Sequence, residues 1–362
     1  MSFPFLELSG DEREQGRGHG EALREKVRQN REIYFERFEK DAGVAREDTL
    51  SRAAAHLFSM RVLSPSYVAG MEGIAEGSNL PLDEIVALNV RYEILYDGIG
   101  KRMMADTRRD GCTGFVLLPE AVDGGRLLSG QNWDWIPEVA GAVLRVKRNG
   151  EPDLLGFTEA GIFGIKLGMN AAGISLSVNG MLTLDDDGQR LERPFHLRCH
   201  NVLGSRSMES ARKALIDTPR SCAANFMLSA LPDSTANLEL GSDSHLELSA
   251  EDGVLVHANH FVDQAAAGVE EPPNPRRHHS EHRHARLDSI LRSAAPMTRY
   301  SLMELLRDHD GHPNSVCRHP DEEVPVDQRV LTVCAVIMEP GSGRMWITEG
   351  PPCEAEFEEY QL

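Results

Sequence analysis

The hydrophobic positions of the first hundred residues recur with the spacing of amphipathic helices. Segments with this spacing cover residues 11–40, 46–62, 65–77 and 82–97. Turn signals such as LSPS and GSNLP separate several of them. Asp11 stands where a side chain can cap the first of these helices. The N-terminal part of the chain is therefore predicted to be helical.

From residue 112 the pattern changes to short runs of β-forming residues punctuated by Gly or Asp-Gly. The first block of these runs predicts strands at 112–118, 126–135, 142–148, 153–159, 164–170 and 173–180. A helical stretch at 194–217 follows, then strands near 223–229, 236–241, 245–249 and 253–257, helices near 283–293 and 300–308, and strands at 330–338 and 344–348. This order of helices and strands predicts a layered α+β protein with sheets packed between helical layers.

Composition places the chain among globular proteins. Its 362 residues, 41% of them hydrophobic, are enough for one large domain or two ordinary ones without a disulfide framework. No CxxC pair occurs among Cys112, Cys199, Cys222, Cys317, Cys334 and Cys353. The N-terminus lacks a secretory signal and the chain lacks an apolar run of membrane-spanning length, so we expect a soluble cytoplasmic protein. A net charge of -19 argues against nucleic acid or an anionic membrane as a partner.

The change of pattern falls at Gly111 and Cys112. Glycine tolerates strained backbone conformations and leaves its carbonyl open to attack by the neighbouring side chain. A Cys112 thiolate can attack that carbonyl and move the acyl group from nitrogen to sulfur, after which water releases the thioester and the chain is cut before Cys112. The new α-amine, with an ordinary pKa of about 7.7 to 8.0, then serves as a base for the thiol of the same residue. The alternative is an inert, packed strand cysteine.

A hairpin is predicted between the first two strand runs, because Asp123-Gly124 is a two-residue turn signal. In that register Cys112 pairs with Trp135, and Asp134 is the next residue along. A three-residue loop that includes Gly125 instead places Asp134 diagonally from Cys112 on the same face of the sheet. Either register brings a carboxylate near the thiol, and only the second directs it correctly. The sequence leaves the choice open.

Several further stretches match a known family in order along nearly the whole chain. They are residues 10–23, 73–93, 110–114, 130–135, 158–180, 257–261 and 312–321. Together they resemble the penicillin acyltransferase (isopenicillin N acyltransferase) family of autoproteolytic N-terminal-nucleophile cysteine hydrolases. The resemblance implies a four-layer αββα sandwich with a helical N-terminal segment. It also implies a precursor cleaved between Gly111 and Cys112 into fragments 1–111 and 112–362, which stay associated as one structural unit.

The same resemblance implies roles for four side chains. Cys112 matches the nucleophile, and Asp134 matches the acidic residue that orients the nucleophilic group. Asn259 matches the donor to the oxyanion, a task that suits a neutral amide because it stabilises charge without titrating. Arg318 resembles a late active-site arginine that holds Asp134 or a substrate carboxylate. The structural alternatives are a turn cap for Asp134, a turn residue for Asn259 and a surface ion pair for Arg318.

The implied activity is hydrolysis or acyl transfer at a carbon–nitrogen bond through a thioester on Cys112. The expected substrate is a small acyl amide or acyl thioester, with no metal or cofactor, and with acyl-CoA as acyl donor in the transferase alternative. Competing hypotheses are a catalytically silent or unprocessed member of the fold and a metal-dependent amidase using the histidines of 278–284. His257, His260 and His319 suggest a papain-like dyad, but an N-terminal amine makes a histidine base unnecessary. The oligomeric state is left open.

Overall fold

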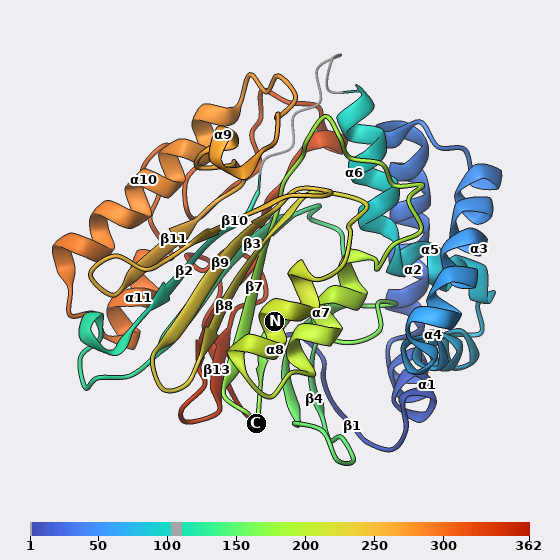
Figure 1. Cartoon of the computed structure of the whole chain (residues 1–362), viewed down its shortest axis with the longest axis horizontal. Coiled ribbons are helices and arrows are strands. Elements are labelled where there is room, and N and C mark those ends of the chain that lie inside the picture. Colours follow the sequence, from blue (N-terminus) through green and yellow to red (C-terminus); the bar gives the residue numbers. More distant parts are fainter. Residues whose placement is uncertain (1, 103–110) are drawn as a thin grey trace.

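The protein has an α+β fold with six N-terminal helices and two β-sheets among the residues described (Figure 1). The computed structural model describes residues 2–102 and 111–362; residues 103–110, which directly precede the expected cleavage site, lie outside the described residues. The α+β class predicted from the sequence is confirmed. None of the helices that the structure describes is long and apolar enough to cross a membrane.

The N-terminal helices gather on one side of the molecule, in blue and cyan on the right of Figure 1. They are α1 (Glu12–Ala22), α2 (Arg24–Arg37), α3 (Arg46–Leu63), α4 (Pro65–Ser78), α5 (Leu82–Asn89) and α6 (Arg91–Arg102). Two predicted helices are each divided, the first at Leu23 and the fourth at Val90, and a π-helical turn at Phe38–Ala42 follows α2. Asp11 caps α1 as predicted, because its carboxylate accepts the Glu14 N–H at 2.8 Å and completes a capping box.

The larger sheet has eight strands in the order β1-β4-β5-β6-β7-β8-β9-β10. They are β1 (Phe5–Leu8), β4 (Gly141–Val146), β5 (Leu154–Glu159), β6 (Leu167–Asn170), β7 (Ile174–Gly180), β8 (Ala224–Ala230), β9 (Ser234–Leu240) and β10 (His245–Leu248). The sequence pattern did not predict β1. This strand pairs in parallel with β4, with Phe5 opposite Val143 and Leu8 opposite Val146. The N-terminal segment thus supplies the edge strand of a sheet that otherwise comes from residues beyond 140.

The smaller sheet has six strands in the order β11-β2-β3-β12-β13-β14. They are β11 (Val254–His257), β2 (Thr113–Leu117), β3 (Leu128–Trp135), β12 (Leu331–Glu339), β13 (Arg344–Ile347) and β14 (Glu358–Gln361). Thr113 lies opposite Asn132, so both predicted registers of the β2–β3 hairpin are wrong. The turn at Asp123-Gly124 does form, but the 3-10 helix Pro119–Ala121 precedes it and lengthens the loop.

The two sheets face each other, since β2 and β3 contact β7 and β8. On the outer side of the eight-stranded sheet, α7 (Phe195–Leu203) and α8 (Met208–Ile216) contact β6 to β9. Against the six-stranded sheet, α10 (Arg277–Ala294) contacts β11 and α11 (Arg299–Leu305) contacts β12. The short helix α9 (Gln264–Ala267) lies near β10. Apolar side chains fill the space between the layers.

Candidate active site

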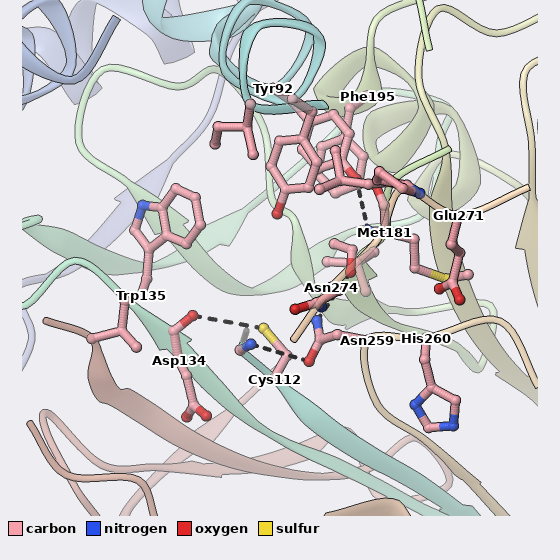
Figure 2. A pocket seen from close by; sticks show the side chains of 18 of the residues that line it. Tyr92, Cys112, Asp134, Trp135, Met181, Phe195, Asn259, His260, Glu271 and Asn274 are labelled. Atoms are coloured by element: carbon pink, nitrogen blue, oxygen red, sulfur yellow. Dashed lines mark hydrogen bonds between the residues drawn. The ribbon is translucent and has the colours of Figure 1, made fainter. Parts of the chain in front are cut away.

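A cavity of about 260 Å³ lies at the junction where the sequence pattern changes (Figure 2). Its wall combines α6 with the strands of both sheets and the segment that precedes α10. The residues that line it include Tyr92, Tyr96, Gly111, Cys112, Trp133, Asp134, Trp135, Lys166, Met181, Phe195, Asn259, His260, Glu271 and Asn274. Both residues of the expected cleavage site therefore line the same cavity.

The Cys112 thiol is buried in this wall. Cys112 is only 6% exposed. Its S–H group donates to the main-chain oxygen of Asp134, with 3.8 Å between sulfur and oxygen. Burial raises the pKa of the thiol to about 12, and the nearby Asp134 carboxylate acts in the same direction. In the intact chain the thiol is therefore protonated at neutral pH.

Arg283 of α10 holds the peptide group between Gly111 and Cys112. Its Nη2 donates to the main-chain oxygen of Gly111, and its Nε donates to Thr113 Oγ1 at 3.0 Å. The arginine is fully buried. A guanidinium on a carbonyl oxygen favours negative charge at that oxygen, which is the charge that develops when a nucleophile attacks the carbonyl carbon. No role for Arg283 was predicted from the sequence.

Asn259 lies beside Gly111 and Arg283. Its Oδ1 accepts the Gly111 N–H at 3.2 Å and a hydrogen bond from Arg283 Nη2 at 3.0 Å. Its Nδ2 donates to the main-chain oxygen of Gly180 at 3.0 Å, and its own N–H donates to Ser280 Oγ at 2.8 Å. In the intact chain Arg283, and not the Asn259 amide, donates to the Gly111 carbonyl. Donation by Asn259 to an oxyanion stays a prediction.

The Asp134 carboxylate points away from the thiol (Figure 2). Its Oδ1 accepts a hydrogen bond from Thr332 Oγ1 at 2.7 Å. The register that would direct this carboxylate at Cys112 does not form, because pairing of Thr113 with Asn132 puts positions 112 and 134 on opposite faces. The main-chain oxygen of Asp134 contacts the sulfur instead.

Arg318 is buried on the side of the sheet that carries the Asp134 carboxylate. The main-chain N–H of Arg318 donates to Thr332 Oγ1 at 2.9 Å, and that hydroxyl in turn donates to the Asp134 carboxylate. Its Nη2 donates to Asn314 Oδ1 at 2.8 Å. Thr332 thus links two residues that the sequence predicted to act together. The catalytic roles of Asp134 and Arg318 stay predictions.

The remaining lining divides into an aromatic side and a charged side. The Tyr92 ring stacks between Tyr96 and Phe195, at centroid distances of 3.8 and 4.2 Å. On the charged side, Arg91 and Lys166 both donate to the buried Glu159 carboxylate. Burial lowers the pKa of Lys166 to about 8, against the opposing effect of Glu159. Two cations share one carboxylate, so the lining keeps positive charge near Arg91 and Lys166, while the stacked rings suit an apolar group.

Two of the histidines weighed as alternatives are hydrogen-bonded to groups other than Cys112. His257 Nε2 lies 2.7 Å from Glu239 Oε1, and His260 Nδ1 lies 2.7 Å from Ser280 Oγ. Burial lowers the pKa of His260 to about 3. The histidines of 278–284 begin α10. Within the described part of the chain, the group of side chains with the donor atoms for a metal ion lies outside that segment.

Comparison with known proteins finds sequence similarity to acyltransferases. The family model described as "Acyl-coenzyme A:6-aminopenicillanic acid acyl-transferase" matches residues 122–354, a range that begins after Cys112. The 40 kDa form of acyl-coenzyme A:6-aminopenicillanic-acid-acyltransferase from Emericella nidulans is 30% identical over 259 residues, which are 70% of this chain and 67% of the fungal protein.

Two solved structures show a more distant likeness. The N-acylethanolamine-hydrolyzing acid amidase ortholog of Caenorhabditis elegans has a TM-score of 0.47 and 17% identity, covering 64% of this chain and 93% of the other. A mutant form of the conjugated bile acid hydrolase of Clostridium perfringens has a TM-score of 0.49 and 14% identity, covering 69% of this chain and 97% of the other.

Proposed function

This chain belongs to the acyl-coenzyme A:6-aminopenicillanic acid acyl-transferase family, as its motifs predicted, and from that premise we propose that it is a self-cleaving cysteine enzyme. In this proposal it acts on the carbon–nitrogen bond of small acyl amides through a thioester on Cys112. One observation carries the proposal. The Gly111–Cys112 bond lies in a cavity wall with its carbonyl on the Arg283 guanidinium and the thiol beside it.

The fold supports an N-terminal-nucleophile architecture in the same proposal. Helices α7 and α8, the eight-stranded sheet, the six-stranded sheet and helices α10 and α11 succeed one another in contact, which is the order of an αββα sandwich. Fragments 1–111 and 112–362 form one unit, and pairing of β1 with β4 supports this because it joins the two across the cut. None of the six cysteines is in a disulfide, which fits the cytoplasm as the proposed compartment.

Maturation begins when Cys112 Sγ loses its proton and attacks the carbonyl carbon of Gly111. Arg283 stabilises the oxyanion of the tetrahedral intermediate, and the carbon–nitrogen bond then breaks. The nitrogen takes up a proton and becomes the α-amine of Cys112, while Gly111 is held as a thioester. Water attacks that thioester, which leaves a carboxylate on Gly111 and regenerates the thiol.

Turnover in this proposal uses the new chain end. The α-amine of Cys112 takes the thiol proton, and the sulfur attacks the acyl carbon of the substrate amide. The departing amine leaves with a proton, and the acyl group remains on sulfur until water removes it. Asn259 is the candidate donor to the oxyanion in this step, because its side-chain amide lies beside Gly111, whose N–H donates to its Oδ1.

The cavity favours an apolar acyl group. The stack of Tyr96, Tyr92 and Phe195 offers flat apolar surface next to the nucleophile. If an amine in place of water accepts the acyl group, the enzyme is an acyltransferase, with acyl-CoA as the donor. The family name favours this second candidate function.

Intact mass measurement and N-terminal sequencing of the purified chain test the proposal. We expect two fragments, the second beginning at Cys112, and release of amine from a panel of small acyl amides. Acyl thioesters offered with and without an amine acceptor separate hydrolase from acyltransferase. A full-length chain that turns over neither amides nor thioesters would identify a silent member of the fold.

The rate of self-cleavage should rise with pH. Because burial raises the pKa of the Cys112 thiol to about 12, the thiolate fraction, and with it the rate, should grow about tenfold per unit between about pH 7 and pH 9. Turnover by the cleaved enzyme should instead level off above the pKa of the α-amine, about 8. Time courses of fragment formation and steady-state rates over the same pH range check both slopes. A flat cleavage profile would contradict attack by the thiolate.

Replacing Asn259 by Ala should lower turnover by the cleaved enzyme about a hundredfold or more, because one donor to the oxyanion is lost. Turnover per mole of cleaved enzyme, obtained from the fragment ratio and the initial rate, is the measurement. Asn274→Ala removes another amide from the cavity lining and serves as the control, with at most a small effect expected. Equal losses in both variants would count against the assigned role.

A further inference from the structure

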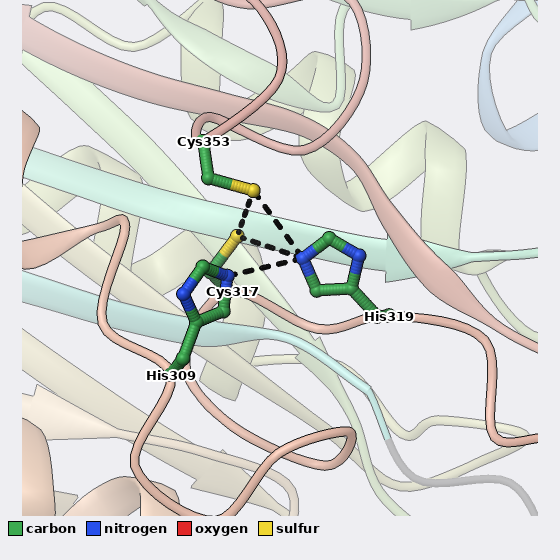
Figure 3. A group of neighbouring side chains, drawn as sticks. All are labelled: His309, Cys317, His319 and Cys353. Atoms are coloured by element: carbon green, nitrogen blue, oxygen red, sulfur yellow. Dashed lines mark hydrogen bonds between the residues drawn. The ribbon is translucent and has the colours of Figure 1, made fainter.

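Four side chains with soft donor atoms meet at a site separate from the cavity (Figure 3). They are His309, Cys317, His319 and Cys353, and their donor atoms all lie within 4.8 Å of one another. We name this group the Cys2His2 cluster. Cys317 is buried, His319 is half-buried, and the other two residues are exposed. No carboxylate takes part, so the cluster differs from the acidic surface groups that are common in proteins.

Four of the six distances between the donor atoms are close to those of a tetrahedral zinc site. Ordinary zinc–nitrogen and zinc–sulfur lengths put the edges of such a tetrahedron at about 3.3 Å for N–N, about 3.5 Å for S–N and about 3.8 Å for S–S. The two Nε2 atoms of His309 and His319 are 3.1 Å apart. The sulfurs of Cys317 and Cys353 lie 3.7 and 3.3 Å from His319 Nε2 and 3.5 Å from each other.

Other features of the cluster fit a metal better than a cross-link. The separation of 3.5 Å between the sulfurs far exceeds the length of a disulfide bond, about 2.05 Å. His319 Nδ1, the ring nitrogen not directed at the cluster, lies 3.5 Å from Glu354 Oε1. A carboxylate behind a histidine is the usual outer partner of a zinc ligand.

We propose that the Cys2His2 cluster binds one structural zinc ion. Four protein ligands close the coordination shell and leave no position for a substrate, which is typical of structural zinc sites. The ion would join the segment 309–319, which follows α11, to Cys353 between β13 and β14. Cys317 and His319 flank Arg318, whose N–H is bonded to Thr332 beside Asp134. The metal would therefore fix the loop that brings Arg318 to the sheet.

Metal analysis of the purified full-length protein tests the proposal. The protein is reduced, loaded with excess zinc, dialysed and measured by elemental mass spectrometry. We expect about one zinc per chain in the wild type. The control variant Cys222→Ala, which loses a cysteine outside the cluster, should bind the same amount. Cys353→Ser and His319→Gln should lose most of it. Cobalt loading should give the d–d bands of tetrahedral coordination and a thiolate charge-transfer band, both absent in Cys353→Ser.

A stability measurement adds a readout that does not depend on activity. A strong chelator should lower the melting temperature of the wild type and leave that of Cys353→Ser unchanged. Because Cys353 is exposed, its replacement should not prevent folding. Wild-type protein that retains no more zinc than the two cluster variants, or metal-free protein with a Cys317–Cys353 disulfide after loading, would overturn the proposal. Neither result would affect the proposed cleavage at Cys112.

Discussion

The Cys112→Ala variant should remain a single full-length chain and show no turnover. Alanine has no nucleophile for the attack on Gly111, so neither the thioester nor the free α-amine of residue 112 can form. Loss of a nucleophile leaves only the rate that binding and oxyanion stabilisation provide, a decrease on the order of 10⁴-fold or more. Intact mass measurement and an assay of amine release report the two effects separately. Cys112→Ser should cleave slowly.

Cys222→Ala is the matched control, since Cys222 is also a buried thiol but does not line the cavity. This control should cleave and turn over at close to the wild-type rate. If Cys112→Ala were cut at position 112, or if an uncut variant kept full activity, the role of the N-terminal amine as base would be refuted.

The second large effect is expected at Arg283. Arg283→Met should slow self-cleavage by about 10²- to 10³-fold, because methionine fills much of the same space but offers no donor to the Gly111 oxygen. Fragment formation is followed by gel densitometry after the purified precursor is shifted to the assay pH. Millimolar guanidinium, far below denaturing concentrations, should restore part of the rate by occupying the vacated position.

Arg286→Met serves as the control on the same helix. Arg286 is paired with Asp308 through hydrogen bonds of 2.7 to 3.2 Å, away from the scissile bond, and its replacement should leave cleavage within a factor of about two of the wild type. Normal cleavage in Arg283→Met would show that the contact with Gly111 is structural only. Slow cleavage that guanidinium does not rescue, together with a lowered melting temperature, would point to a folding defect.

The sequence predicted most of the secondary structure because helical and strand periodicities are local signals. The register of strand pairing depends on tertiary contacts, and both registers predicted for the β2–β3 hairpin are wrong. The turn at Asp123-Gly124 forms where its residues predicted, but an isolated bridge between Val122 and Met297 and a hydrogen bond from Asp123 N–H to Met297 hold the loop to a distant segment. The loop is therefore longer than a two-residue hairpin. The four residues of β1 were too few to show a period.

The site shows a similar division between local and tertiary information. Asn259 lies beside Gly111, the residue that precedes Cys112, and its role at the oxyanion stays a prediction. Arg283 was missed because an arginine in a basic helix is usually solvated. One local signal was available, since Arg283 follows the same helical face as Leu287 and Leu291, and all three are buried. A charged residue on an apolar stripe indicates a buried partner.

The Cys2His2 cluster could not be read from spacing. Cys317 and His319 form one close pair, His309 lies earlier in the same loop, and Cys353 comes from a separate segment. Zinc motifs that are recognisable from sequence carry two close pairs of ligands. The loop after α11 and the segment before β14 meet only in the folded chain.

The position of β1 would determine how the protein behaves after the proposed cleavage. A strand hydrogen-bonded along β4 cannot leave without breaking a row of main-chain bonds, so we expect the shorter polypeptide to stay in the cleaved protein on dilution. Material produced without residues 1–111 would present β4 as a bare sheet edge, a template for intermolecular pairing and aggregation. After the proposed cleavage, the leading segment would be a permanent subunit, unlike a disposable propeptide.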